Sequence, residues 1–170
     1  MKKYEFTGET KQVELWNRTA MLHRIRATVE FGFVKVGELG GWIEKEENLS
    51  HEGKAWVWGN AKVCGDAKVC GDVEVWGNAK VWGNAEVCGD AEVFLASHVL
   101  VMGPVGSRNN FTTFFRDKDN EITVKCGCFL GKIDKFLEKV TQTHGNNKYA
   151  LVYRAAVEVA KLQIELTERK

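Results

Sequence analysis

The sequence has little excess charge, a single proline and no long apolar run. Its 170 residues carry 24 Lys and Arg against 23 Asp and Glu, a net charge of +1. A dedicated nucleic-acid-binding protein normally carries a basic excess, so this balance argues against that role and leaves room for a local cationic cluster. No segment has the apolar length of a membrane span or of a signal peptide. These absences predict a cytoplasmic protein that binds neither membrane nor nucleic acid.

Cysteine is not abundant enough to suggest a disulfide framework. The chain has five cysteines, and in a reducing compartment we expect them to be thiols rather than disulfides. Cys126-Gly127-Cys128 is a close pair, but no second pair lies at the spacing of a zinc site. No Gly-Lys-Ser/Thr loop of the Walker type is present. We therefore predict neither a metal nor another cofactor.

Glycine is abundant, with 17 residues, and it marks a repeat. Read from Ala55 to Leu100, the chain divides into eight hexads: AWVWGN, AKVCGD, AKVCGD, VEVWGN, AKVWGN, AEVCGD, AEVFLA and SHVLVM. Valine holds the third place in all eight, and glycine followed by Asn or Asp closes six. Such self-similarity indicates a repeat architecture.

Each hexad combines a short strand with a turn. The first four places alternate between small apolar and other residues, which is the pattern of a strand with one buried face. Ala and Val in the first and third places are expected to point inward. The second place (Lys, Glu or Trp56) and the fourth place (Trp, Cys or Phe) are expected to point outward. Gly with Asn or Asp then turns the chain, because both tolerate the backbone angles of a tight corner.

This pattern resembles the hexapeptide repeat of left-handed parallel β-helices. The resemblance implies that three hexads form one coil of about 18 residues, so that residues 18 apart stack on one another. Trp58, Trp76 and Phe94 would then form one outward column, and Cys70 with Cys88 another. The predicted fold class is mainly β: a left-handed parallel β-helix with an N-terminal β cap, followed by a C-terminal β-hairpin and two α-helices.

The flanks are expected to differ from the repeat. Residues 1–36 carry short β-like runs and are predicted to cap the open end of a repeat domain at 37–102, whose first coil, residues 37–54, is degenerate. Residues 103–170 are predicted to hold a hairpin of 111–116 and 121–126, a helix closed by His144-Gly145, and a second helix to about Glu168. The second helix is apolar on more than one side, which predicts packing on two surfaces.

The segments GELGGWIEKEENLSHEG, MGPVGSRNNFTTFF and VKCGCFLGKIDKF resemble a group of uncharacterised hexapeptide-repeat proteins of bacteriophages and prophages. This resemblance implies a phage origin and the cytosol of a bacterial host, and it assigns no catalytic residue. By analogy with phage accessory proteins, it favours a non-enzymatic binding protein that sequesters or senses a nucleotide-like ligand to counter host immune signalling.

The polar stretch after the repeat is the predicted ligand site. Arginine, hydroxyl groups and glycine amides are the groups that hold phosphate or carboxylate. The candidate ligand-binding residues are Ser107, Arg108, Asn109, Thr112, Thr113, Arg116 and His144. Lys148 could join them if the helices fold back over the site. An ordinary loop with solvated arginine remains the alternative.

Two other functions stay open at this point. Hexapeptide-repeat acyltransferases resemble this chain in their repeat and use a histidine as general base, for which His98 is the first candidate and His51 the second. However, no loop interrupts the hexads to cover an acyl donor. The other alternative is a structural or protein-docking module. Trp58, Trp76, Trp82 and Phe94 would expose a large apolar surface, which predicts a homo-oligomer, a trimer or a dimer, with these residues in the interface.

Overall fold

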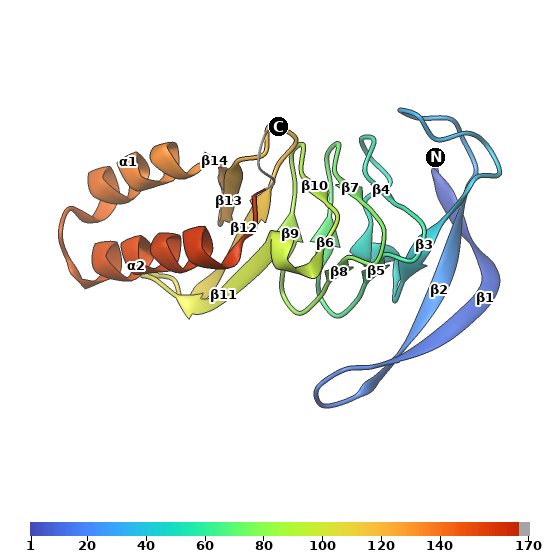
Figure 1. The fold of residues 1–170 in the computed structure, drawn as a ribbon, viewed down its shortest axis with the longest axis horizontal. Coiled ribbons are helices and arrows are strands. Elements are labelled where there is room, and N and C mark those ends of the chain that lie inside the picture. The colour runs from blue at the N-terminus through green and yellow to red at the C-terminus, as the bar shows by residue number, and fades with distance from the viewer. Residues whose placement is uncertain (167–170) are drawn as a thin grey trace.

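The computed structural model describes residues 1–166, which form an elongated molecule. The N-terminal strands lie at one end, the hexads in the middle and two helices at the other end (Figure 1). The longer strands are β1 Tyr4–Glu14, β2 Thr19–Ala27, β3 Leu39–Ile43, β11 Val99–Val105, β12 Asn110–Arg116, β13 Ile122–Cys126 and β14 Phe129–Lys132. The hexads contribute two-residue strands: β4 Trp56–Val57, β5 Lys62–Val63, β6 Lys68–Val69, β7 Glu74–Val75, β8 Lys80–Val81, β9 Glu86–Val87 and β10 Glu92–Val93. The helices are α1 Ile133–His144 and α2 Lys148–Gln163, with short 3-10 turns at Glu46–Asn48 and Ala96–His98.

The predicted fold class is wrong. The described chain is a mixed α/β structure of several short sheets and two α-helices, not a mainly-β chain built on a left-handed parallel β-helix. The longest strands, β1 and β2, pair antiparallel, and all four strands of the β11–β14 sheet do so as well. The parallel strands β4 to β10 of the hexads are only two residues long, because a Gly-Asn or Gly-Asp corner closes six of the eight hexads. The antiparallel sheets outside the hexads therefore decide the fold class, and the repeat pattern did not predict these sheets.

The predicted 18-residue register between hexads is confirmed. Trp56 pairs with Glu74, Lys62 with Lys80 and Lys68 with Glu86, all in parallel. The degenerate segment before the repeat continues this stacking, since the Ser50 amide donates to the Val69 carbonyl at 2.9 Å. Close stacking also explains the corner glycines. Gly71 has a φ of +79°, and a Cβ there would lie 2.7 Å from the carbonyl oxygen of Gly89.

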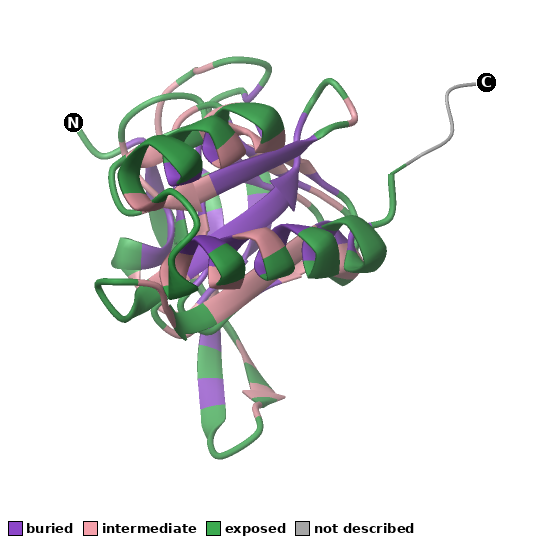
Figure 2. Cartoon of the chain, turned by 90° about the vertical axis from the view of Figure 1, so that its left-hand side faces the viewer, coloured by how far each residue is buried: buried purple, intermediate pink, exposed green. Residues whose placement is uncertain are grey.

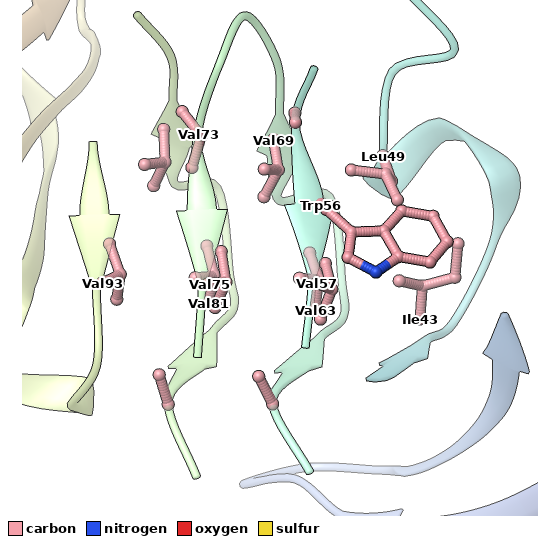
Figure 3. Packing of buried hydrophobic residues seen from close by; sticks show 14 of the residues in the cluster. Ile43, Leu49, Trp56, Val57, Val63, Val69, Val73, Val75, Val81 and Val93 are labelled. Atoms are coloured by element: carbon pink, nitrogen blue, oxygen red, sulfur yellow. The ribbon is translucent and has the colours of Figure 1, made fainter. Parts of the chain in front are cut away.

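The core of the hexads is a column of valine and alanine. The third-place valines from Val57 to Val93 are fully buried, together with the first-place alanines. Figure 3 shows these valines stacked along the inside of the hexads, with Trp56, Leu49 and Ile43 at the end of the column. This buried cluster runs from Tyr4 to Phe115 and so crosses both of the predicted domain boundaries.

The N-terminal residues cover one end of this column. Trp56, expected to point outward, is instead fully buried, because the rings of Tyr4 and Phe31 pack against it at 6.3 and 5.4 Å. The Tyr4 hydroxyl donates to the carbonyl of Leu49 at 2.9 Å. A large apolar side chain at the end of the repeat thus becomes core once the flank folds over it.

The C-terminal part is a four-stranded sheet backed by α1 and α2. The predicted hairpin is confirmed as β12 and β13, paired from Arg116–Ile122 to Thr112–Cys126. The first helix ends at His144, and Gly145 follows with a φ of +59°. Asn147 caps α2 by accepting from the amides of Tyr149 and Ala150. This helix ends at Gln163, earlier than expected, and Glu168 lies outside the described residues.

Figure 2 looks onto this end of the molecule and shows both helices lying over the buried strands, with their inner sides buried and their outer sides exposed. Among residues 1–166, no helix is long and apolar enough to cross a membrane.

Candidate functional site

A cavity of about 240 Å³ opens where the turn between β11 and β12, the turn between β13 and β14, and the end of α1 meet. Its walls combine cationic, aromatic, hydroxyl and thiol groups. The lining residues are Ser107, Arg108, Asn110, Cys126, Gly127, Cys128, Phe129, Phe136, Lys139, Val140, Thr143, His144 and Tyr153. The cavity therefore brings together three of the predicted ligand-binding residues, Ser107, Arg108 and His144.

Tyr153 of α2 supports the turn that carries Ser107 and Arg108. The turn begins at Gly106, whose φ is +76°. A Cβ at Gly106 would lie 1.9 Å from the Tyr153 hydroxyl oxygen, so only glycine leaves room for this contact. Asn109 closes the turn in the left-handed region, with a φ of +46°, and does not line the cavity. The close contact fixes the position of the turn relative to α2.

Aromatic rings form the inner wall. Tyr153 packs edge-on against Phe136 at 5.6 Å, and Phe129 lies 5.4 Å from Phe136. His144, the last residue of α1, stacks on Tyr153 with ring centroids 5.8 Å apart and an interplanar angle of 28°. The α1–α2 turn thus holds the imidazole at the edge of the cavity, beside an apolar wall that suits a ring-shaped ligand group.

The charge of the cavity is positive. Arg108 and Lys139 line it, and no Asp or Glu of residues 1–166 does so. Neither cation forms an ion pair with a carboxylate in that range, and both side chains are exposed. An anion entering the cavity would therefore meet cations that no internal carboxylate has neutralised.

Tyr153 stays protonated in this setting. Burial raises the pKa of its phenol, the neighbouring Cys126 raises it further, and Arg108 acts weakly in the opposite direction. Cys126 in turn accepts a hydrogen bond from the Thr112 hydroxyl, at 3.3 Å between Oγ1 and Sγ. The neutral phenol and the Cys126 thiol thus add polar groups beside the aromatic rings of the inner wall.

Four predicted ligand-binding residues lie outside the cavity. Thr112 is buried and donates its hydroxyl hydrogen bond to Cys126, and Asn109 is exposed to solvent. Thr113 Oγ1 accepts a hydrogen bond from the Glu86 amide at 2.9 Å. Arg116 is 8% exposed and donates to the Glu92 carbonyl at 3.1 Å and to Asn120 Oδ1 at 3.0 Å. Thr113 and Arg116 therefore attach the C-terminal sheet to the hexads.

Several lining residues were not predicted. Lys139 and Thr143 lie on α1 within five residues of His144, so their position in the same helix was the signal that could have identified them. Tyr153 and Cys128 carried no such signal, because they reach the cavity from other elements. Lys148 does not line the cavity, and its ammonium group lies 5.4 Å from the Tyr149 ring.

The proposed interface residues occupy two separate places. Trp58 and Trp76 stack at 4.5 Å and 6°, and Phe94 continues the column at 6.4 Å, so the predicted column is confirmed. Trp82 lies on a different face, 45% exposed, and lines a groove of about 550 Å³ with Leu15 and Trp16. The assignment of these residues to an oligomer interface stays a prediction.

The two candidate histidines for acyl transfer have structural contacts. His98 is 4% exposed, and its Nδ1 accepts from the Phe94 amide at 3.1 Å. Burial lowers its pKa, and Arg116 lowers it further. His51 stacks on Tyr4 at 4.3 Å, and its Nδ1 accepts from the Lys3 amide. A general base must reach its substrate, and the burial of His98 works against that role.

The cysteines differ from the expectation of thiols. Cys70 and Cys88, stacked 18 residues apart, form a disulfide, so the prediction is wrong for this pair. The 18-residue register places their Cα atoms 4.7 Å apart, within reach of a disulfide. Cys64, Cys126 and Cys128 are free. Over residues 1–166, no group of three or more His, Cys, Asp or Glu side chains is placed to hold a metal ion.

Comparison with known proteins assigns no family. No family model matches the chain, and no protein of curated function matches it.

Proposed function

We propose that this protein is a non-enzymatic binding protein that holds a small anionic ligand in the cavity between the β11–β12 turn and the end of α1. One observation carries the proposal: Arg108, Lys139 and His144 line the same cavity, and no carboxylate of residues 1–166 lines it. Ser107 and Thr143 add hydroxyl donors at the same cavity. Guanidinium and ammonium groups with hydroxyl donors bind phosphate or carboxylate.

The size of the cavity limits what enters it. Its volume of about 240 Å³ is below the roughly 300–1,000 Å³ typical of sites that enclose a drug-sized ligand. A phosphate or carboxylate group with part of a ring fits this space, while the rest of a nucleotide would remain at the mouth. Phe129 and Tyr153 supply the apolar surface for a ring. A nucleotide-like ligand is therefore held by its phosphate end.

The biological role that we attach to this binding is sequestration or sensing of a nucleotide-like signal of the bacterial host by a phage-encoded protein. This part of the proposal rests on the resemblance of the sequence to phage and prophage hexapeptide-repeat proteins. The anion-binding cavity supports it only by supplying a suitable site.

Isothermal titration calorimetry with inorganic phosphate, AMP and a cyclic dinucleotide tests the proposal. We expect the wild-type protein to bind at least one of these probes. Arg108→Ala should weaken that binding by roughly tenfold to a hundredfold, because a hydrogen bond to a charged group contributes about 1.5–3 kcal/mol. Its melting temperature should not change, since Arg108 is exposed.

Arg26→Ala is the matched control. It removes the same charge from β2, where Arg26 pairs with Glu5 at 2.5 Å, and should leave binding unchanged. The proposal fails if no probe binds to the wild-type protein, or if Arg108→Ala binds as tightly as wild type.

A further inference from the structure

Two of the free cysteines, Cys126 and Cys128, are separated by a single glycine at the turn between β13 and β14. Cys126 ends β13 and pairs with Phe129 across the turn, so Gly127 and Cys128 are the two turn residues. Gly127 has a φ of +57°, which reverses the direction of the chain between the cysteines. In such a turn, Cα atoms two residues apart lie roughly 5–6 Å from each other, which is within reach of a disulfide bond.

The two thiols border the same cavity but differ in exposure. Both residues line the cavity of about 240 Å³ at the end of α1. Cys128 is exposed, whereas Cys126 is only partly exposed and its Sγ accepts a hydrogen bond from the Thr112 hydroxyl at 3.3 Å. In thiol–disulfide exchange, an accessible thiol attacks first and a second thiol beside it resolves the mixed disulfide. The geometry therefore fits Cys128 to the first step and Cys126 to the second.

The charge of the cavity determines which disulfide approaches these thiols most readily. Arg108 and Lys139 line the same walls, and no carboxylate of residues 1–166 does so. A small disulfide that carries carboxylates is attracted by such a field, because clefts lined by one sign of charge raise the local concentration of the opposite charge. An anionic disulfide such as glutathione disulfide therefore meets complementary charge beside Cys128.

We propose that Cys126 and Cys128 form a thiol–disulfide exchange site for a small anionic disulfide. The Cys128 thiolate attacks one sulfur of the disulfide, which forms a mixed disulfide at Cys128 and releases the other half as a thiolate. The Cys126 thiolate then attacks the Cys128 sulfur, which closes the Cys126–Cys128 bond and releases the second half. The two cysteines are oxidised, the small disulfide takes up their two electrons, and their two protons end on the two released thiols.

The preference for an anionic reagent rests on the proposed anion binding, since both use Arg108 and Lys139. The exchange itself rests only on the two thiols. A neutral disulfide therefore reports on the thiols alone, and an anionic disulfide reports on the thiols and the cations together.

Mass spectrometry of tryptic peptides tests the site, because cleavage after Lys125 and Lys132 leaves both cysteines in the peptide 126–132. Wild-type protein is incubated with glutathione disulfide or with neutral 2-hydroxyethyl disulfide, and the remaining thiols are blocked with iodoacetamide before digestion. We expect the peptide 126–132 to lose two hydrogens with both reagents. Cys64, a buried free thiol in the peptide 63–68, should be unmodified by either disulfide.

Two serine variants separate the roles of the thiols. Cys126→Ser should stop at the mixed disulfide on Cys128, because no second thiol is left beside it to resolve the bond. Cys128→Ser should react roughly tenfold more slowly or less, because the remaining thiol is less accessible. Stable accumulation of the mixed disulfide in Cys126→Ser is a result that a merely structural cysteine pair would not give.

Arg108→Ala tests the recruitment by charge. It should slow the reaction with glutathione disulfide by roughly threefold or more and leave the reaction with the neutral disulfide unchanged. Arg26→Ala removes the same charge from β2 and should leave both rates unchanged.

The proposal is overturned if the wild-type peptide 126–132 loses no hydrogens with either reagent, or if Arg108→Ala reacts with glutathione disulfide as fast as wild type. Calorimetry of reduced wild-type protein with inorganic phosphate and nucleotides is an independent measurement. Anion binding without exchange overturns the redox site alone, and exchange with the neutral disulfide without anion binding overturns the proposed function and the preference for an anionic reagent.

Discussion

At the scale of single residues, Asp117 shows how the turn between β12 and β13 is stabilised. Its carboxylate is fully buried and accepts hydrogen bonds from the Thr123 hydroxyl at 2.6 Å and the Lys132 ammonium at 2.6 Å, and from the amides of Asp119 and Glu121. Burial alone would raise the pKa of this carboxyl, but the bonds from Lys132, Thr123 and Glu121 outweigh it, so the pKa lies below its ordinary value of 3.8.

This lowered pKa predicts a defined pH dependence. Since the folded-state pKa of Asp117 is below the unfolded value, its stabilising contribution is fully present above about pH 3.8 and is lost as the pH falls through the folded pKa. Asp117→Asn should lower the free energy of unfolding by about 2–4 kcal/mol at pH 7, because an amide leaves the buried donors incompletely paired. Urea denaturation at pH 7 and pH 3 measures both effects.

The control for this prediction is Asp119→Asn, on the same turn, whose side chain is more than half exposed. It should change the free energy of unfolding at pH 7 by well under 1 kcal/mol. If Asp117→Asn loses as much stability between pH 7 and pH 3 as wild type does, then Asp117 is not a source of the acid sensitivity.

The candidate site was predictable only in part, and the alternation of strand β12 explains why. The polar cluster after the repeat correctly indicated Ser107 and Arg108, since both lie in a turn whose side chains reach solvent. Thr113 and Arg116 lie on the strand that follows, where successive side chains face opposite sides of the sheet. The sequence does not reveal which side meets the helices, so residues that bind the hexads were grouped with residues that line the cavity.

At the scale of elements, the hexads are held by stacking of identical backbone units and by one covalent link. The Cys70–Cys88 disulfide joins two stacked hexads and closes a segment of 18 residues. By the chain-entropy model, closing a loop of this length stabilises the folded state by about 3 kcal/mol. We expect Cys70→Ser, or reduction of the wild-type protein, to lower the free energy of unfolding by about 2–4 kcal/mol in urea denaturation.

Cys128→Ser serves as the control, because Cys128 is a free, exposed thiol. This variant should be as stable as wild type without reductant and should lose the same stability as wild type when reductant is added. Equal stability of oxidised and reduced wild-type protein would contradict a stabilising role of the disulfide.

The elements themselves divide into those that the pattern predicted and those that it did not. The 18-residue register followed from the regular return of valine and glycine, and the helix end at His144 followed from Gly145. The fold class did not follow, because neither strand alternates along its whole length: β1 is exposed along most of its 11 residues, and the alternation of β2 breaks at His23 and Arg24. Their length comes from pairing with each other and with β3, a tertiary effect that a single-strand pattern does not carry.

At the scale of the whole molecule, strand β12 contributes a buried residue to each of the two largest hydrophobic clusters. Phe115 is fully buried in the cluster of the hexads, and its neighbour Phe114 is fully buried in the cluster of the C-terminal helices. Because adjacent strand residues face opposite sides, one strand links the two clusters. Arg116 strengthens this link through the Glu92 carbonyl. The hexads and the C-terminal part should therefore unfold together.

Phe114→Ala and Phe115→Ala test this coupling as a matched pair. Each should lower the free energy of unfolding by about 3–5 kcal/mol, because each removes a fully buried ring from a packed core. Differential scanning calorimetry should give one transition for both variants, displaced downward by a similar amount, and hydrogen exchange should accelerate in hexads and helices alike. If the cores were independent, Phe115→Ala would split the transition and leave the protection of α1 and α2 unchanged. A single displaced transition in both variants would mean that ligand binding beside Tyr153 also stabilises the hexads, since any ligand of the folded state then acts on one cooperative unit.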